Sequence, residues 1–221
     1  MILSQEHQMI RDALRTFSQE RLAPNAARWD KEHHFPKEEL MELAALGAFG
    51  VAVPEELGGA GMDYVSLALV LEEIAAGDGG TSTVISVNNC PVCSIGMMYA
   101  NAQQKEQWLR PLAQGEMLGA FCLTEPHTGS DAAALRTTAT RDGDDYVLNG
   151  VKQFITSGKH ADVAIVMAVT TGTPARKASA RSGCRHRQRA TSSPASSRRW
   201  ASTHPTPRKS CLKTAAFRRR T

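Results

Sequence analysis

Residues 172–221 contain no aspartate or glutamate. All 22 acidic residues lie in residues 1–171, together with 12 of the 26 lysines and arginines, so this part carries a net charge of −10. The other 14 basic residues give 172–221 a charge of +14, and the whole-chain value of +4 describes neither part. A charge block of one sign and this length indicates that the two parts of the chain differ in kind.

The chain also lacks a long apolar run. No stretch is long enough to span a bilayer, and the N-terminal sequence MILSQEHQMIRDAL has neither a basic start nor a long apolar segment, so no secretory signal is indicated. Hydrophobic residues make up 42 % of the chain, which is ordinary for a soluble protein with a buried core. We therefore expect a cytoplasmic protein without a membrane partner.

Cysteine is scarce, with five residues in the chain. Cys90 and Cys93 form a C-x-x-C pair, but no second ligand pair stands at the spacing of a zinc site, so no metal site is predicted. The region is helical or irregular rather than βαβ, which argues against a redox pair. We interpret both as buried packing cysteines in a reducing compartment. His33, His34 and His127 likewise have no matching ligand set.

Helical periodicity dominates residues 1–116. The segment Tyr64–Ala76 is largely apolar, as expected for a central helix, and its Glu72 and Glu73 are predicted to lie at the solvent edge. Gly115 is positioned to end the last helix. We therefore predict an all-α helical domain over 1–116.

The period changes after residue 116. LGAFCLT, LRTTATR, YVLNG, VKQFITS and ADVAIVMAVT read as strands, with DGDD as a turn. These strings predict a truncated antiparallel β domain over 117–171, whose last strand, 162–170, would have an unpaired edge. The tail, 172–221, has almost no branched aliphatic residue and is predicted to be disordered. The fold class is therefore α+β with a disordered basic tail.

The stretch LTEPHTGSD at 123–131 gathers small hydrogen-bonding groups at the end of a predicted strand. The hydroxyls of Thr124, Thr128 and Ser130, together with Gly129, which permits close backbone approach, suit an anion or a flat heteroaromatic ring. A polar turn with side chain–backbone hydrogen bonds is the more ordinary interpretation of the same residues. Taken alone, the stretch leaves both interpretations open.

The longer string FCLTEPHTGSD resembles the first signature of the acyl-CoA dehydrogenase family. Further similar strings follow in the family's order: PEELGGAGMD at 54–63, QKEQWLRPLAQGE at 104–116 and LNGVKQFITSGKHAD at 148–162. The resemblance covers about 1–171 without a gap. It implies a fold with an N-terminal helical domain, a middle β domain and a C-terminal four-helix bundle, with FAD in a groove between the last two.

The resemblance also implies a reaction and partners. The reaction is α,β-dehydrogenation of an acyl-CoA substrate, as in fatty-acid oxidation or branched-chain amino-acid catabolism, with electrons passed to an electron-transferring flavoprotein. Intact members are homotetramers through contacts of the C-terminal bundle, an assembly not expected of this chain. The catalytic glutamate also belongs to that bundle, so we assign no catalytic residue and expect a truncated, inactive form. Glu125 is interpreted as a structural neighbour of the flavin loop.

Two segments are implied as cofactor-binding. The first would wrap the flavin and pyrophosphate with Phe121, Cys122, Leu123, Thr124, Gly129 and Ser130. The second would line the other side of the ring with Phe154, Ile155 and Thr156. Thr124 would meet the pyrimidine edge, Thr156 would lie near flavin N5, and Ser130 would also touch the pantetheine arm of the substrate.

The tail suggests a change of reading frame. If each codon is shifted back by one base, Trp200–Pro207 permits Met-Gly-Gln-His-Ala-Ser-Asp-Thr, and Arg208–Arg219 permits Glu-Lys-Ile-Val-Phe-Glu-Asp-Cys-Arg-Ile-Pro-Ala. These strings resemble the family's next segments in order. We hypothesise a frameshift near Thr170–Thr173, which the nucleotide sequence around codons 165–180 would test.

Two other functions fit parts of the sequence. A flavin monooxygenase or acyl-CoA oxidase shares the fold, but the T-E-P-x-x-G-S-D string favours the dehydrogenase. The +14 tail has the charge of a nucleic-acid-binding segment, but it has few aromatic residues and no recognised module, so no nucleic-acid partner is predicted. A gel-shift assay at several salt concentrations, comparing the full chain with residues 1–171, would test the nucleic-acid-binding alternative.

Overall fold

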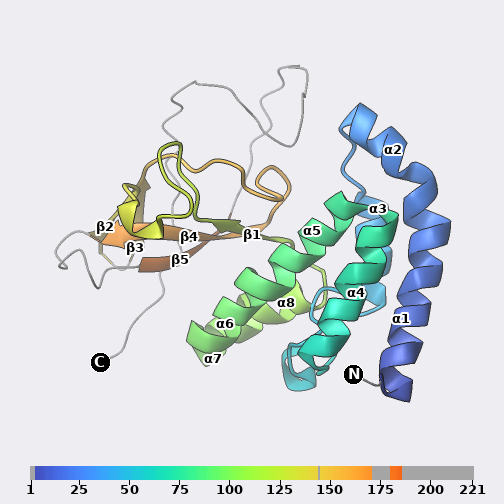
Figure 1. The fold of residues 1–221 in the computed structure, drawn as a ribbon. Coiled ribbons are helices and arrows are strands. Elements are labelled where there is room, and N and C mark those ends of the chain that lie inside the picture. The colour runs from blue at the N-terminus through green and yellow to red at the C-terminus, as the bar shows by residue number, and fades with distance from the viewer. Residues whose placement is uncertain (1–2, 144, 171–179, 186–221) are drawn as a thin grey trace. The chain divides into compact units, whose positions relative to one another are not determined.

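A computed structural model of the chain describes residues 3–143, 145–170 and 180–185 (Figure 1). The chain divides into two compact units between Leu118 and Gly119. Each unit is described below by itself. In the part of the chain that the structure describes, no helix has the length and apolarity needed to cross a bilayer.

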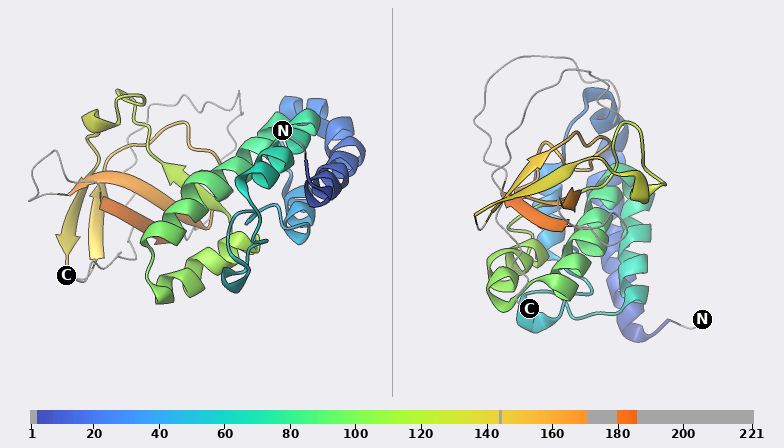
Figure 2. Two further views of the ribbon diagram at one scale, coloured as in Figure 1. Left: turned by 60° about the horizontal axis from the view of Figure 1, so that its bottom comes forward. Right: turned by 90° about the vertical axis from the view of Figure 1, so that its left-hand side faces the viewer.

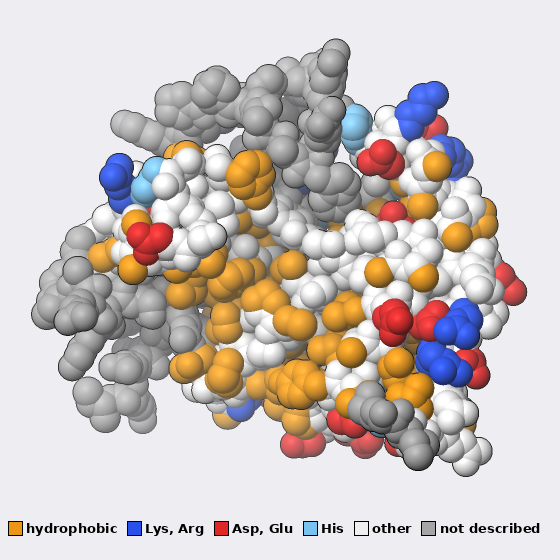
Figure 3. All heavy atoms as spheres, in the orientation of Figure 1, with side chains coloured by type: hydrophobic (Ala, Val, Ile, Leu, Met, Phe, Trp, Pro, Cys, Tyr) orange, Lys and Arg blue, Asp and Glu red, His pale blue; other side chains and the backbone are white. Residues whose placement is uncertain are grey.

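The first unit is built from helices. In chain order they are α1 (Gln5–Phe17), η1 (Ser18–Leu22), α2 (Ala23–Glu32), α3 (Lys37–Ala45), η2 (Glu55–Leu57), α4 (Tyr64–Gly77), α5 (Gly79–Val87), η3 (Asn88–Cys93), α6 (Ser94–Tyr99), α7 (Ala102–Gln104), η4 (Lys105–Leu109) and α8 (Arg110–Ala113). Helix α4 packs against both α1 and α5, and the three lie side by side in Figures 1 and 2. Hydrophobic side chains gather over α5 and α6 in Figure 3, and Met98 and Tyr99 of α6 are exposed.

Capping residues tie the starts of α1 and α4 together. The Ser4 hydroxyl accepts from the His7 amide, and the Ser4 amide donates to His7 Nδ1, which forms a capping box. His7 Nε2 lies 3.1 Å from the carboxylate of Asp63, the N-cap of α4. Because Asp63 also accepts from the amide and hydroxyl of Ser66, the pKa of its carboxyl is lowered to about 2.

The core of this unit is largely apolar, and it includes a buried carboxylate that pairs with a half-exposed arginine. Leu22, Leu43 and Ile74 are fully buried. Glu73 of α4 is only 6 % exposed, and Arg15 of α1 donates to its two carboxylate oxygens at 2.6 and 3.0 Å. The prediction that Glu73 lies at the solvent edge is therefore wrong, because the packing of α1 on α4 covers it. Glu72 is exposed, as predicted.

The cysteine interpretation holds for one residue of the pair. Cys93 is fully buried in η3, and burial raises the pKa of its thiol to about 12. Cys90 is exposed, so the prediction that it packs in the interior is wrong. Both lie in a π-helical turn around Pro91, where the missing proline N–H accompanies the wider turn. Among the described residues, no cluster of three or more potential ligands is placed to hold a metal ion.

The second unit holds a five-stranded mixed sheet. Its strands are β1 (Gly119–Cys122), β2 (Thr138–Asp142), β3 (Asp145–Asn149), β4 (Val163–Thr170) and β5 (Ala180–Arg185), and a short 3-10 helix, η5 (Ala132–Ala134), precedes β2. The order is β1-β4-β2-β3, with β5 also paired to β4. Strand β4 runs parallel to β1 and β2 and antiparallel to β5.

The antiparallel prediction is therefore only partly right. The pairs β2–β3 and β4–β5 are antiparallel, and Gly143, with φ +61°, supports the tight turn between β2 and β3. The pair β1–β4 is parallel because a long connection returns the chain to the same end of the sheet before β4 begins.

Residues 151–157, VKQFITS, are not a strand, contrary to prediction. The backbone at Phe154 and Ser157 is left-handed, with φ of 57° and 60°, which interrupts an extended conformation. The segment is instead an irregular connection between β3 and β4.

The last predicted strand is not at an open edge. Its residues in β4 pair with β1 and β2 and, over Val163–Ala168, with β5. The prediction of disorder from residue 172 onward is therefore wrong for Ala180–Arg185. Strand pairing uses backbone groups, so a segment poor in branched aliphatic residues can still join a sheet. The other residues of the predicted tail lie outside the described residues.

Candidate cofactor site

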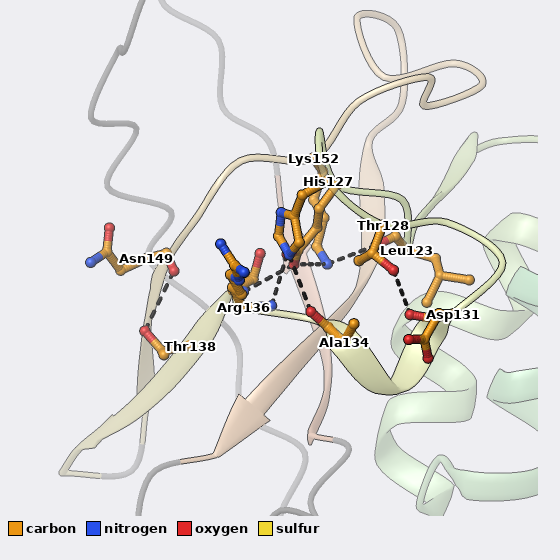
Figure 4. Close-up of polar contacts among 11 residues, drawn as sticks. Leu123, His127, Thr128, Asp131, Ala134, Arg136, Thr138, Asn149 and Lys152 are labelled. Carbon is orange, nitrogen blue, oxygen red and sulfur yellow. Dashed lines mark hydrogen bonds and ion pairs between the residues drawn. The ribbon is translucent and has the colours of Figure 1, made fainter.

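The structure joins the first predicted cofactor segment to Lys152 and Gln153, which directly precede the second. The Gln153 amide donates to the Thr124 carbonyl at 3.0 Å, and Lys152 Nζ donates to the Leu123 carbonyl at 2.8 Å. Leu123 and Thr124 follow β1 directly, whereas Lys152 and Gln153 follow β3. Figure 4 shows the Lys152 side chain reaching from its own segment towards that of Leu123. The two segments, far apart in sequence, therefore form one local surface.

A buried carboxylate, that of Glu125, lies within the first segment directly after Thr124. Glu125 is 3 % exposed and accepts from Lys152 Nζ at 2.8 Å and from the amides of Arg136 and Thr137 at 2.8 and 2.9 Å. Burial by itself would raise the pKa of this carboxyl, but the hydrogen bonds from these groups outweigh it and lower the pKa to about 2. Glu125 is thus an ionised structural group. With its oxygens occupied in this way, it is poorly suited to remove a proton from a substrate.

The stretch Glu125–Asp131 is a hydrogen-bonded turn. Glu125 and Thr128 exchange two backbone hydrogen bonds, and the Thr128 hydroxyl donates to the Asp131 carbonyl. His127 Nε2 lies 3.1 Å from the Ala134 carbonyl and 3.5 Å from the Glu125 carboxylate, as Figure 4 shows. The polar-turn interpretation is therefore confirmed for Thr128. It does not account for Thr124, Gly129 and Ser130.

Gly129 is not required by the folded backbone. A methyl group added there would meet only the Thr124 side chain, at 3.5 Å from Cγ2 and 3.9 Å from Oγ1, and the backbone is not left-handed. An alanine would fit in this space. A glycine in such a position leaves room for another molecule to approach the backbone closely.

The remaining predicted site residues differ in exposure. Phe121, Cys122, Leu123, Thr124, Gly129, Ile155 and Thr156 are half-buried, and Ser130 is exposed. Phe154 is 59 % exposed although it is a large aromatic residue, and its left-handed backbone is uncommon for a bulky side chain. Next to Thr156, the Ser157 hydroxyl is buried and has no hydrogen-bond partner among the described residues. An exposed aromatic ring and an orphaned donor fit a segment that a ligand completes.

Sequence reasoning missed the residues that join the segments. Lys152 lies inside a family motif, but no role was predicted for its side chain. The Arg136 and Thr137 contacts use backbone amides, which nearly every residue has, so their side chains do not indicate these contacts. The one available sign was a charged residue, Lys152, inside a segment predicted to be a strand.

Comparisons with known proteins agree with these features. The model of the acyl-CoA dehydrogenase N-terminal domain matches residues 4–116, and that of the acyl-CoA dehydrogenase middle domain matches residues 120–186. The chain belongs to the acyl-CoA dehydrogenase family. The middle-domain match runs past the domain boundary predicted at residue 171.

Individual relatives support the same assignment. The chain is 43 % identical over 168 residues to the mitochondrial short-chain specific acyl-CoA dehydrogenase of Rattus norvegicus, a match that covers 76 % of this chain and 41 % of the relative. The butyryl-CoA dehydrogenase structure from Megasphaera elsdenii matches with a TM-score of 0.79 and 34 % identity over 84 % of this chain and 49 % of that one. A glutaryl-CoA dehydrogenase from Mycobacterium smegmatis, in complex with FADH2, matches with a TM-score of 0.74 and 37 % identity over 82 % and 45 %. The chain spans less than half the length of these proteins.

Proposed function

We propose that this chain supplies the helical domain and part of the cofactor-binding β domain of an FAD-dependent acyl-CoA dehydrogenase. The observation that carries the proposal is the pair of hydrogen bonds from Lys152 and Gln153 to the Leu123 and Thr124 carbonyls. These bonds hold the two motif segments as one surface.

The proposed roles of the residues follow from this surface. The backbone of Leu123 and Thr124, with the Thr124 hydroxyl, holds the pyrimidine edge of the flavin, and the Thr156 hydroxyl lies near N5. Gly129 and Ser130 hold the pyrophosphate through close backbone approach, and Ser130 also contacts the pantetheine arm. When bound, FAD supplies the hydride acceptor for the β-hydrogen of the acyl thioester. Hydrogen bonds at these edges favour the reduced, anionic flavin.

The proposed substrates are short acyl-CoA thioesters, and the proposed electron acceptor is an electron-transferring flavoprotein. The substrate proposal is supported by the similarity to short-chain and butyryl-CoA dehydrogenases. A general base must come within hydrogen-bond reach of the α-proton. We assign no such base among the described residues, because the resemblance places it in a C-terminal bundle.

Two expectations follow for the 221-residue chain. It should bind FAD weakly, since half of the groove belongs to that bundle, and it should not reduce flavin with butyryl-CoA. A yellow purified sample that is bleached by butyryl-CoA would contradict both. The middle-domain match up to residue 186 and the pairing of β5 with β4 do not support the hypothesis of a frameshift near Thr170–Thr173, which the nucleotide sequence around codons 165–180 tests.

The test of the FAD proposal must detect weak binding. The isotope-labelled chain is titrated with FAD, and amide chemical shifts are followed by NMR. Saturable shifts are expected at Leu123, Thr124, Gly129 and Thr156, with little change in helices α1–α4. If FAD moves no amide in these two segments, or moves amides uniformly over the chain, the proposed function is wrong.

A further inference from the structure

Lys152 occupies an unusual position for a lysine. Its side chain is only 10 % exposed, and its Nζ donates to two acceptors at 2.8 Å, the Glu125 carboxylate and the Leu123 carbonyl. Figure 4 shows Lys152 beside the segment that carries Leu123. A lysine is rarely buried unless its charge is compensated, and here Glu125 supplies the opposite charge.

The ion pair connects three parts of the second unit. Glu125 accepts from the Arg136 and Thr137 amides, which lie just before β2, and Lys152 follows β3. The Leu123 carbonyl lies at the end of β1. Charge compensation alone would need only the Lys152–Glu125 contact, so the second bond, to Leu123, calls for a separate explanation.

The bond to Leu123 has a geometric consequence. The peptide group between Leu123 and Thr124 is planar and trans, so its C=O and N–H point in opposite directions. By holding the Leu123 oxygen, the ammonium also sets the direction of the Thr124 N–H, which points away from Lys152. The Gln153 amide holds the next carbonyl, that of Thr124, in the same way. The orientation of two consecutive peptide groups is thus set from the second cofactor segment.

We propose that Lys152 is a positioning residue, whose ammonium orients the Thr124 peptide N–H towards the flavin while Glu125 holds the ammonium in place. This inference rests on the proposed FAD site. Its effect is preorganisation: a donor that is already aimed loses less conformational freedom on binding. The residue does not touch the flavin itself.

A purely structural role makes different predictions. If Lys152 serves only to neutralise Glu125, removing both charges together should restore normal behaviour. If only the aliphatic stem matters, Lys152→Met, which keeps much of that stem, should be silent. A positioning role predicts that both variants bind FAD more weakly than the parent chain, because both lack a donor for the Leu123 carbonyl.

Three variants of the full chain separate these roles: Lys152→Met, the double variant Glu125→Gln with Lys152→Met, and the exposed control Lys31→Met. Amide hydrogen exchange is measured by NMR without ligand, and FAD affinity is measured from chemical shifts in the same samples. Lys152→Met should lower the protection of the Arg136 and Thr137 amides from hydrogen exchange. Because Glu125 loses its counter-charge, this protection should also depend on pH above 4. The double variant should recover that protection, since a glutamine oxygen can still accept, yet keep faster exchange at Gln153.

The FAD titration decides the cofactor part. Both Lys152 variants should bind FAD at least tenfold more weakly than the parent chain, and Lys31→Met should match the parent. If the double variant binds like the parent, Lys152 only compensates charge and the inference is overturned. If amide exchange at Gln153 does not change in either variant, the inference is overturned regardless of the FAD affinities. If the parent chain shows no FAD response while Gln153 loses protection in both variants, the proposed function fails and the ordering of the Thr124 peptide by Lys152 stands.

Discussion

The substitution Gly129→Ala separates a structural glycine from one that serves a ligand. The nearest atoms to the added methyl would be Thr124 Cγ2 at 3.5 Å and Oγ1 at 3.9 Å, which are ordinary van der Waals contacts. Because the backbone is not left-handed, alanine can adopt it without strain. The folded state therefore loses nothing, and the unfolded chain loses freedom, so we expect a gain of about 0.5 kcal/mol in the free energy of unfolding.

The expected effect on FAD has the opposite sign. The methyl would stand on the surface where the pyrophosphate is proposed to approach the backbone. A displacement that costs about 1.4 kcal/mol weakens binding tenfold. We therefore expect a variant that is at least as stable as the parent chain and binds FAD about tenfold more weakly.

The assay combines urea unfolding, followed by circular dichroism, with the FAD titration by NMR. Gly79→Ala is the matched control, because a methyl at Gly79 meets nothing within 4 Å and lies in the first unit. The control should keep the parent affinity for FAD. The reasoning is refuted if Gly129→Ala destabilises the chain by more than about 1 kcal/mol, since the glycine would then be structural, or if it is stable and binds FAD like the parent.

Three further predictions concern stability. Arg15→Met leaves the buried Glu73 carboxylate without its counter-ion and should lower the free energy of unfolding by about 2 kcal/mol. An effect below about 0.5 kcal/mol in urea unfolding would show that water replaces the ion pair. Gly115→Ala should lower the free energy of unfolding by about 3 kcal/mol or more, because φ at this residue is +72° and the methyl would stand 2.3 Å from Ala44 Cβ. An unchanged melting temperature would contradict this. The folded-state pKa of Glu125 is depressed to about 2 from 4.5, so its contribution is complete above about pH 4.5 and is lost as the pH falls towards 2. Glu125→Gln should therefore flatten the acid limb of the stability–pH curve, and parallel curves for variant and parent would be inconsistent with a paired, ionised carboxylate.

Local patterns predicted much of the architecture. The largely apolar segment Tyr64–Ala76 forms the central α4, and Gly115 adopts the left-handed backbone expected at the end of a helix. The change of period after residue 116 corresponds to the change from helices to a sheet. These features depend on residues only a few positions apart, so they can be predicted from local sequence patterns.

Patterns failed where a partner from elsewhere in the chain decides the outcome. Glu73 was predicted to be exposed because its own helix does not reveal that Arg15 packs over it. VKQFITS has the composition of a strand, but its backbone turns at Phe154 and Ser157. The strand over Ala180–Arg185 has an unpromising sequence and depends on β4 for its hydrogen bonds.

The candidate site divides in the same way. The sequence by itself determined which two segments carry small hydroxyls, glycine and an aromatic residue, because residue identity is local information. Only the tertiary structure decided that these segments meet, through the bonds of Lys152 and Gln153 to Leu123 and Thr124. The physical reason is that a hydrogen bond between residues so far apart in the chain depends on how β1, β3 and β4 pair, and strand pairing is a property of the whole sheet.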